Sequence, residues 1–451
     1  MVQVMVSLLL LLVTVHHVST HLMPATDDQY DVLSRIDVDD SVVAVVRRNK
    51  ILHLLYDETI IGAEFDDPML RKQTTYPGFT IMQCSAYLDR KPSRALQIGL
   101  GIGSVPSFLR DMDIPTDVVE ISEAVVIQAA DYFQYEWCVL SDDEEDEKCP
   151  NGQTFVMDGL EFLNRKPKDL EIQTQEDTNP YDLFIVDVYT GWNPFAFLVR
   201  EKILLIRKNW LTIDGVLVMN FVGFMHGPRA AAPKSIYRTL QSAFKHVKCF
   251  REMEDPNDPE AGNIVFYASD KHIDFALPST GIYKDPPPNT FYSVVTNFPN
   301  WQIFTDLDSE VEVAIHQEVD DDKVRFVPNN DSYKTDEGPA LRVLTEASHG
   351  QKDFHDIHVE TQNHMRERVL SQFPLALWNE LKQDNWSQRP LLRNHQQVCC
   401  QILFSHLAAR QIAYATRHPP SASHLRMRLH HSLICFLEKP ECTISKINRQ
   451  Q

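Results

Sequence analysis

The sequence lacks the excess of positive charge that a nucleic-acid-binding protein needs. Lys and Arg together number 43 against 63 Asp and Glu residues, and the formal net charge is −20. Nucleic acids and anionic membrane surfaces both attract proteins through basic patches, so neither is expected as the main partner. The acidic run at 141–148 (SDDEEDEK) is expected to be a solvated loop, and it would also attract a polycationic substrate. Cys138 and Cys149 flank this run and would close a short loop if oxidised, which the loop-entropy model values at about 3 kcal/mol.

The sequence also shows no apolar run long enough for a stable membrane span. The run Val6 to Val15 (VSLLLLLVTV) is shorter than the ~20 residues that a transmembrane helix needs and matches the apolar part of a signal peptide. We therefore predict that residues 1–25 are a signal peptide and that the protein is secreted or enters the secretory pathway. Two further absences count against this prediction: no Lys or Arg precedes the run, and no clear cleavage site follows it. Without a signal peptide the protein would be cytoplasmic.

The length of 451 residues predicts a large central domain with smaller flanking regions. Residues 26–88 alternate apolar and polar positions in short stretches, which predicts a small β-rich unit. Residues 89–272 have the pattern of the core domain. After the run Asp285-Pro-Pro-Pro, residues 285–389 are expected to form a smaller mixed region, and residues 390–451 a basic, disordered tail.

Within the core, apolar runs alternate with amphipathic segments, as in a parallel sheet covered by helices on both faces. This order predicts an α/β fold with a Rossmann-like, seven-stranded methyltransferase core. The expected strands are 95–100, 117–122, 154–158, 182–188, 215–221, 247–253 and 263–269. The expected helices are 105–112, 123–135, 160–164, 195–209 and 234–245.

A glycine-rich turn follows the first strand of the core. Gly99, Gly101 and Gly103 lie in the run GLGIG, directly before an expected helix. Glycines allow the backbone to turn sharply and to approach a cofactor closely, with the N–H groups of the helix facing it. On its own such a run is a weak signal, because tight turns often contain it.

Acidic residues end the next three strands. Glu120 ends the second strand, where an acid can accept both hydroxyls of a ribose. Asp158, followed by Gly159, ends the third strand, where a carboxylate can accept from an adenine amino group. Asp187 ends the fourth and faces the crevice in which open α/β sheets bind ligands. A single acid in such a place is often a helix cap, but a glycine turn and three acids at successive strand ends favour a nucleotide site.

These stretches resemble the spermidine synthase-like superfamily, which contains polyamine aminopropyltransferases and related S-adenosylmethionine-dependent methyltransferases. The resemblance runs from about Tyr56 to Ala268 and is carried by RALQIGLGIGSVPSFL, DVVEIS, VMDGLEFL and YDLFIVDVYTG. It implies a β-rich unit before a Rossmann-like core, often a homodimer, and S-adenosylmethionine or its decarboxylated form as cofactor. It also implies that Glu120 holds the ribose, Asp158 the adenine, and Asp187 the amine near the sulfonium.

The sequence departs from the aminopropyltransferase pattern at three positions. The first loop of those enzymes carries an acid that helps to hold the amine of the decarboxylated cofactor, and Ile102 stands there instead. Their second acid after the fourth strand deprotonates the attacking amine, and here that position is Thr190, whose hydroxyl is too weak a proton acceptor. A Tyr-Gln pair in their substrate gate reads Tyr76-Pro77.

This combination resembles the methyltransferase branch of the superfamily, whose glycine loop lacks the acid. Methyl transfer from a sulfonium needs in-line positioning and exclusion of water more than a base, because the leaving group is already activated. We therefore predict an S-adenosylmethionine-dependent methyltransferase with a small-molecule or amine acceptor. Asp187 is the expected catalytic residue, and Tyr76, Tyr189, Thr190 and Trp192 are expected to contact the substrate.

Two alternatives stay open. The first is an aminopropyltransferase of polyamine biosynthesis that uses another base, such as Asp182; the second is a secreted binding protein that keeps the fold without turnover. Asn220, at the end of the fifth strand, is a weaker candidate for contact with the acceptor. No metal site is expected, because His355, His358 and His364 lie among acids without a recognisable ligand spacing.

Overall fold

The chain divides into two compact units, Met1–Gln383 and Asp384–Gln451, and all described residues lie in the first. The expected signal peptide at 1–25 and the expected tail at 390–451 fall outside the described residues. No helix in the described part of the chain is long and apolar enough to cross a membrane. The computed structural model describes residues 29–67, 70, 72–138, 149–170, 172, 180–189, 195–252, 260–278, 290–305, 343–347 and 352–382.

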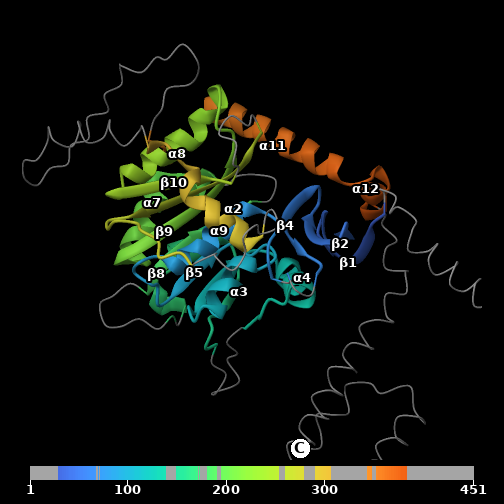
Figure 1. The fold of residues 1–451 in the computed structure, drawn as a ribbon, viewed down its shortest axis with the longest axis horizontal. Helices are drawn as coiled ribbons and strands as arrows, with labels where there is room; N and C mark the ends of the chain where they lie inside the picture. Colours follow the sequence, from blue (N-terminus) through green and yellow to red (C-terminus); the bar gives the residue numbers. More distant parts are fainter. Residues whose placement is uncertain are drawn as a thin grey trace, which may run out of the picture. The chain divides into compact units, whose positions relative to one another are not determined.

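An antiparallel sheet of four strands opens the described chain (Figure 1). Its strands follow one another in order and are joined by tight turns. The turn residues Asp39, Asn49 and Asp57 have φ angles of 50°, 51° and 50°, and Asn and Asp tolerate this left-handed region, which two-residue hairpin turns require. The strands are β1 (Asp31–Val38), β2 (Ser41–Arg48), β3 (Ile51–Tyr56) and β4 (Thr59–Phe65).

The second sheet has eight strands in the order β12-β10-β11-β9-β8-β5-β6-β7. Strands β5 to β9 pair in parallel, which confirms the predicted α/β core. The remaining strands pair antiparallel, contrary to an all-parallel sheet; β10 and β11 are joined by a connection too short for the helical crossover that parallel neighbours need. The strands are β5 (Ala95–Ile98), β6 (Thr116–Glu120), β7 (Thr154–Val156), β8 (Tyr181–Val186), β9 (Leu211–Gly223), β10 (His246–Arg251), β11 (Gly262–Ser269) and β12 (Gln302–Ile303).

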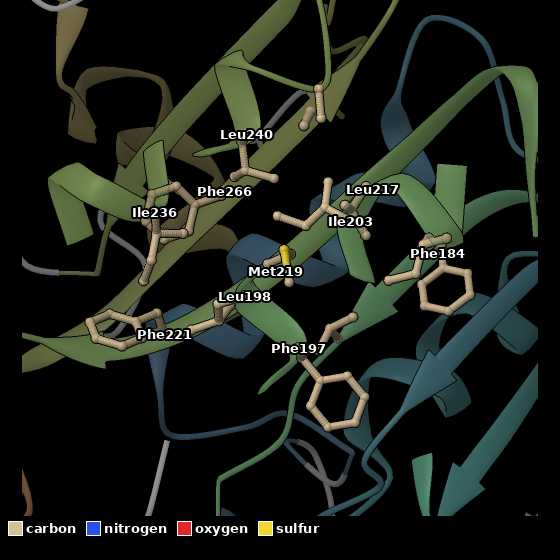
Figure 2. Close-up of a cluster of buried hydrophobic side chains, with 14 of the residues drawn as sticks. Phe184, Phe197, Leu198, Ile203, Leu217, Met219, Phe221, Ile236, Leu240 and Phe266 are labelled. Carbon is tan, nitrogen blue, oxygen red and sulfur yellow. The ribbon is translucent and has the colours of Figure 1, made fainter. Parts of the chain in front are cut away.

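Helices cover both faces of this sheet. Successive side chains of a strand point to opposite faces, so Met219 belongs to one apolar cluster and Val218 to the other. Figure 2 shows the first cluster, in which β9 side chains meet Ile203 and its neighbours. This face carries α5 (Gly159–Asn164), α6 (Phe195–Leu198), α7 (Arg200–Asn209) and α8 (Ala231–Gln241). The second face carries α2 (Pro77–Gln83), η1 (Cys84–Tyr87), α3 (Ser104–Asp111), α9 (Phe291–Asn297) and η4 (Phe298–Trp301).

Two details of the core differ from the expected elements. The helix expected at 195–209 is two helices, because Val199 between them is extended, with φ −81° and ψ 148°. The helix α4 (Glu123–Phe133) ends before Tyr135 and packs with β2 and β3 in the apolar cluster that joins the two sheets. Cys138 and Cys149 form a disulfide. Two further short helices are η2 (Pro167–Leu170) and η3 (Pro228–Ala230).

Two helices late in the chain cover the other face of the N-terminal sheet. They are α11 (Lys352–Gln372) and α12 (Leu375–Leu381), drawn in orange in Figure 1, where α11 leads from the region of α8 to α12 beside β1 and β2. Leu377 and Trp378 pack there against Ala44, Val46 and Leu55. The sequence predicts only a weakly patterned region at 285–389. The buried face of α11 explains the weak pattern, since it includes polar side chains such as His358 and Thr361.

Leu377→Ala is expected to lower the free energy of unfolding by about 2–5 kcal/mol, because truncating a fully buried Leu leaves a cavity. Leu375→Ala is the matched control in the same helix: this side chain is 73% exposed, and its loss should change stability by about 0.5 kcal/mol or less. Urea unfolding followed by circular dichroism measures both variants. Equal losses in the two would contradict the packing of α12.

Candidate nucleotide and acceptor site

A cavity of about 640 Å³ lies at the carboxyl ends of the parallel strands. Open α/β sheets bind ligands at this edge, where the strand order reverses, and here the reversal lies between β5 and β8. Polar groups line the cavity in the order of the strands. They are Asp158 after β7, Glu120 on β6, the glycine turn after β5, Asp187 after β8, Asn220 on β9, Asn263 on β11 and Glu252 after β10.

The glycine turn brings the backbone of β5 against two neighbours. A Cβ at Gly99 would lie 2.0 Å from the carbonyl oxygen of Asp187, and one at Gly101 would lie 2.5 Å from that of Ile61. Both glycines also have positive φ, 87° and 56°, so only glycine fits. Both line the cavity, whereas Gly103 caps the start of α3 and is absent from the described lining.

Glu120 is fixed beside the glycine turn by two backbone donors. Each carboxyl oxygen accepts one N–H, from Leu100 and from Ser122, both at 2.9 Å. Burial raises the pKa of Glu120 above its usual value, and these hydrogen bonds oppose the rise. The result is an oriented acceptor group that faces a cavity, which suits hydroxyl donors of a ligand.

Asp158 serves as a helix cap and also lines the cavity. Its Oδ1 accepts the backbone N–H of Glu161 at 2.8 Å and so caps α5. The cap occupies one of its two carboxyl oxygens, and Gly159 beside it lines the cavity as well. Asp158 can therefore cap α5 and still accept a hydrogen bond from a ligand in the cavity.

Asp187 begins a chain of hydrogen bonds that runs from the end of β8 across β9 and β11 to the end of β10. The side-chain amide of Asn220 donates to Asp187 Oδ1 and to Asn263 Oδ1, both at 2.9 Å. Asn263 donates in turn to Glu252 Oε2 at 2.8 Å. Glu252 also accepts the backbone N–H groups of Asn263 at 2.8 Å and of Gly78 at 3.1 Å, which ties the chain to α2.

Sequence reasoning missed Asn263 and Glu252. Both lie where expected strands begin or end, but β10 and β11 were expected to run parallel to the others. Because β11 is antiparallel, its first residues meet the carboxyl ends of its parallel neighbours. The direction of a strand follows from its pairing, which its own residues do not reveal.

The expected substrate residues are only partly described. Tyr76, which precedes α2, and Tyr189, after β8, both line the cavity. Burial raises the pKa of Tyr76 well above its usual value and that of Tyr189 to about 12, so both hydroxyls are neutral donors near pH 7. Thr190 and Trp192 lie outside the described residues.

Two other expected positions lie away from the cavity. Ile102, at the position of the acid in aminopropyltransferases, is 3% exposed and packs between the two sheets. Asp182, the alternative base, lies near the start of β8, at the opposite end of the strand from Asp187. It accepts hydrogen bonds from the Ser93 N–H and from the Thr212 hydroxyl, both at 3.0 Å, and it is not among the described residues that line the cavity, so it is not placed to act there as the alternative base.

The helix α11 supplies a wall of the cavity that the sequence did not indicate. Its contribution is mostly polar, and no motif within it marks it as part of a site. Arg366 binds Glu58 in an ion pair, and Lys382 binds the same carboxylate at 2.7 Å. The lining residues of α11 are Gln362, Asn363, Met365, Arg366, Arg368, Val369 and Gln372.

The histidines of α11 take part in other contacts. His364 forms a 2.8 Å hydrogen bond with Glu260 and lies against the ring of Phe224, while His358 is buried. The side chain of His355 lies outside the described residues. Among the side chains that are described, no group of three or more His, Cys, Asp or Glu is arranged to hold a metal ion.

Two curated relatives share parts of this sequence, and no known protein-family profile matches it. An N-terminal histidine N-methyltransferase from Emericella nidulans is 24% identical over 283 residues, which are 59% of this chain and 46% of the relative. A polyamine aminopropyltransferase from Vibrio vulnificus is 29% identical over 165 residues, 36% of this chain and 48% of the relative. The chain thus spans about half the length of the curated relatives it matches.

Among solved structures, a spermidine synthase from Thermotoga maritima aligns with 62% of this chain and 88% of its own, with 15% identity and a TM-score of 0.43. The two curated relatives confirm the predicted resemblance to the superfamily of spermidine synthase-like proteins and S-adenosylmethionine-dependent methyltransferases. Both relatives are transferases by name.

The pKa of Asp187 generates a prediction on stability. Burial raises it from 3.8 to about 6, the charge of Glu120 adds to the rise, and the hydrogen bond from Asn220 opposes it. A raised acid pKa means that ionisation destabilises the fold, so this cost grows between about pH 4 and 6 and is complete above pH 6. Asp187→Asn, which keeps an oxygen for Asn220, should therefore gain more thermal stability over the wild type at pH 8 than at pH 5. Gains of equal size at the two pH values would contradict the raised pKa.

Proposed function

We propose that this protein is an S-adenosylmethionine-dependent methyltransferase that acts on an amine. The observation that carries the proposal is an asymmetry of the cavity. Glu120 and Asp158, whose carboxylates can accept hydrogen bonds from a nucleoside, line the cavity. The acid that would hold the amine of a decarboxylated cofactor is replaced by Ile102. Ile102 is uncharged and buried between the sheets, so this position supplies no group to hold such an amine.

On this proposal the two ends of the cavity have different tasks. Glu120 accepts the ribose hydroxyls, and the second oxygen of Asp158 accepts from the adenine amino group. Asp187 lies between these groups and the acceptor end of the cavity, by which we mean the end near Asn263 and Glu252. Above about pH 6 its carboxylate is charged, so it can hold the ammonium group of the cofactor while Asn220 fixes its orientation.

When bound, the cofactor supplies a methyl group activated by its positive sulfur. The protein then needs to hold the acceptor nitrogen in line with the sulfur–methyl bond and to exclude water. Tyr76 and Tyr189 can hold the acceptor as neutral hydrogen-bond donors, and α11 can exclude water as a wall of the cavity. The nitrogen must arrive uncharged, with its lone pair available for the new bond, and it loses a proton to solvent afterwards.

The names of the relatives support an amine as acceptor. One is a histidine N-methyltransferase and the other a polyamine aminopropyltransferase, so both are named for transfer to nitrogen compounds. The second match also supports aminopropyl transfer as an alternative function, with the decarboxylated cofactor as donor. That alternative requires a base other than Asp182.

The donor separates the two functions. Calorimetric titration of the full chain with S-adenosylmethionine and with its decarboxylated form is expected to give tighter binding of the intact cofactor. Tighter binding of the decarboxylated form, with turnover of a diamine, would replace methyl transfer by aminopropyl transfer. Binding of neither would reject both.

Glu120→Gln is expected to weaken binding of S-adenosylmethionine at least tenfold, or about 1.4 kcal/mol, because one of the two acceptor oxygens becomes a donor. Glu123→Gln is the matched control: this exposed acid lies in the first turn of α4 and outside the described lining. Calorimetry on both variants, with thermal unfolding to check folding, measures the difference. Equal affinity in the two variants would reject the assignment of the ribose site.

We also propose that the protein enters the secretory pathway. The disulfide between Cys138 and Cys149 supports this location, because disulfides persist mainly in oxidising compartments. Peptide mapping of the secreted and the intracellular fractions, without reduction, tests it. The homodimer implied by the resemblance stays a prediction.

A further inference from the structure

Two opposite charges face the acceptor end of the cavity without forming an ion pair with each other. Glu252 is held by three N–H groups, from Asn263 and Gly78. The guanidinium of Arg368, on α11, donates from one nitrogen to the carbonyl oxygen of Ala261 at 3.0 Å. Within the described residues neither side chain has an ion-pair partner. Both line the cavity, so each keeps a charge that a ligand can meet.

The backbone contacts of these two residues bring both charges to the part of the cavity that Tyr76 lines: the Gly78 N–H, two residues after Tyr76, donates to Glu252, and Arg368 binds the carbonyl oxygen of Ala261, two residues before Asn263. Burial is the main cause of the raised pKa of Tyr76, the carboxylate of Glu252 raises the pKa further, and the guanidinium of Arg368 lowers it. Both charges therefore act on the same buried hydroxyl. A cation, an anion and a neutral donor thus converge on one end of the cavity, beyond Asp187 in the order of the strands.

The neighbouring arginine of α11 differs in this respect. Arg366 also lines the cavity, but its guanidinium is paired with Glu58, which Lys382 neutralises as well. Arg368 has a single hydrogen bond to a neutral carbonyl. A guanidinium has five N–H donors in a planar fork that matches a carboxylate, so most of its donor capacity is unused among the described residues.

We propose that Arg368 and Tyr76 form a carboxylate-binding subsite at the acceptor end of the cavity. This inference rests on the proposed function for its choice of ligands. The ligand carboxylate comes either from the acceptor, which is then an amino acid-like molecule with its amine toward Asp187 and Glu252, or from the methionine part of the intact cofactor. The position of Ala261 next to β11, two strands beyond β8, favours the acceptor as the source.

Such a subsite disfavours diamines as acceptors. A diamine would bring its second ammonium group to the guanidinium of Arg368, and like charges in a partly buried site repel each other strongly. An amino acid-like acceptor instead brings a carboxylate to Arg368, and its uncharged amine can still donate hydrogen bonds toward Glu252. The cavity would then select against polyamines, although its nucleoside-side residues resemble those of polyamine aminopropyltransferases.

Matched ligand pairs test the subsite. The first pair is 4-aminobutanoate and 1,4-diaminobutane, which have chains of similar length, and the second is S-adenosylmethionine and its decarboxylated form. Calorimetric titration of the full-length wild type is expected to show at least tenfold tighter binding of the carboxylate member in one pair. That pair identifies the source of the carboxylate.

Arg368→Gln should abolish the preference by weakening the carboxylate member and, in the first pair, by relieving the repulsion of the diamine, and Arg368→Lys should restore part of it. Arg229→Gln is the matched control, because Arg229 also ties α11 to the core, through Glu360 at 3.2 Å, but does not belong to the described lining. It should keep the wild-type ratio. Thermal unfolding of each variant separates loss of folding from loss of the subsite.

Two results would overturn the inference. The first is a wild type without a carboxylate preference in either pair. The second is an Arg368→Gln variant that weakens both members of a pair equally, which would indicate a purely structural tie between α11 and Ala261. A protein that binds neither cofactor but keeps an Arg368-dependent preference for 4-aminobutanoate would instead reject the proposed function and leave the subsite in place.

Discussion

The closest backbone approach in the site is the one on which its geometry depends. The turn after β5 fits between the end of β8 and the N-terminal sheet only because Gly99 and Gly101 have no side chains; a Cβ on either would meet a carbonyl oxygen within 2.5 Å. The same turn gives the Leu100 N–H to Glu120. The close approach of the two sheets and the orientation of Glu120 therefore both depend on one short loop.

The strand order places polar groups of two different kinds on the two sides of the glycine turn. On one side of the turn lie acids held by backbone donors, which suit neutral hydroxyl and amino groups. On the other side, the side-chain amides of Asn220 and Asn263 link the carboxylates of Asp187 and Glu252 by hydrogen bonds. Asn220 holds the carboxylate of Asp187 directly, and Asn263 and Glu252 fix the orientation of Asn220 in turn, without adding a charge next to Asp187.

Much of this arrangement could be predicted from the sequence. The glycine turn, Glu120, Asp158 and Asp187 are recognisable because parallel strands place their carboxyl ends together, and each lies directly after an apolar run. Asn263 and Glu252 could not be found in this way, since their place at the edge depends on the antiparallel direction of β11. The wall formed by α11 was also hidden, because a helix that buries His358 and Thr361 lacks the apolar stripe by which sequence patterns are recognised.

The packing of α11 and α12 on the first sheet has a consequence for synthesis of the chain. Arg48 donates to the carbonyl oxygen of Gln372, 324 residues later in the sequence. At about 5–20 residues per second, the ribosome needs on the order of 15–65 s to make that stretch. During this time Ala44, Val46 and Leu55 lack the helices that cover them in the finished fold. The nascent chain therefore exposes an apolar β-surface until α11 and α12 have been made, and during this interval the surface is open to association with other chains.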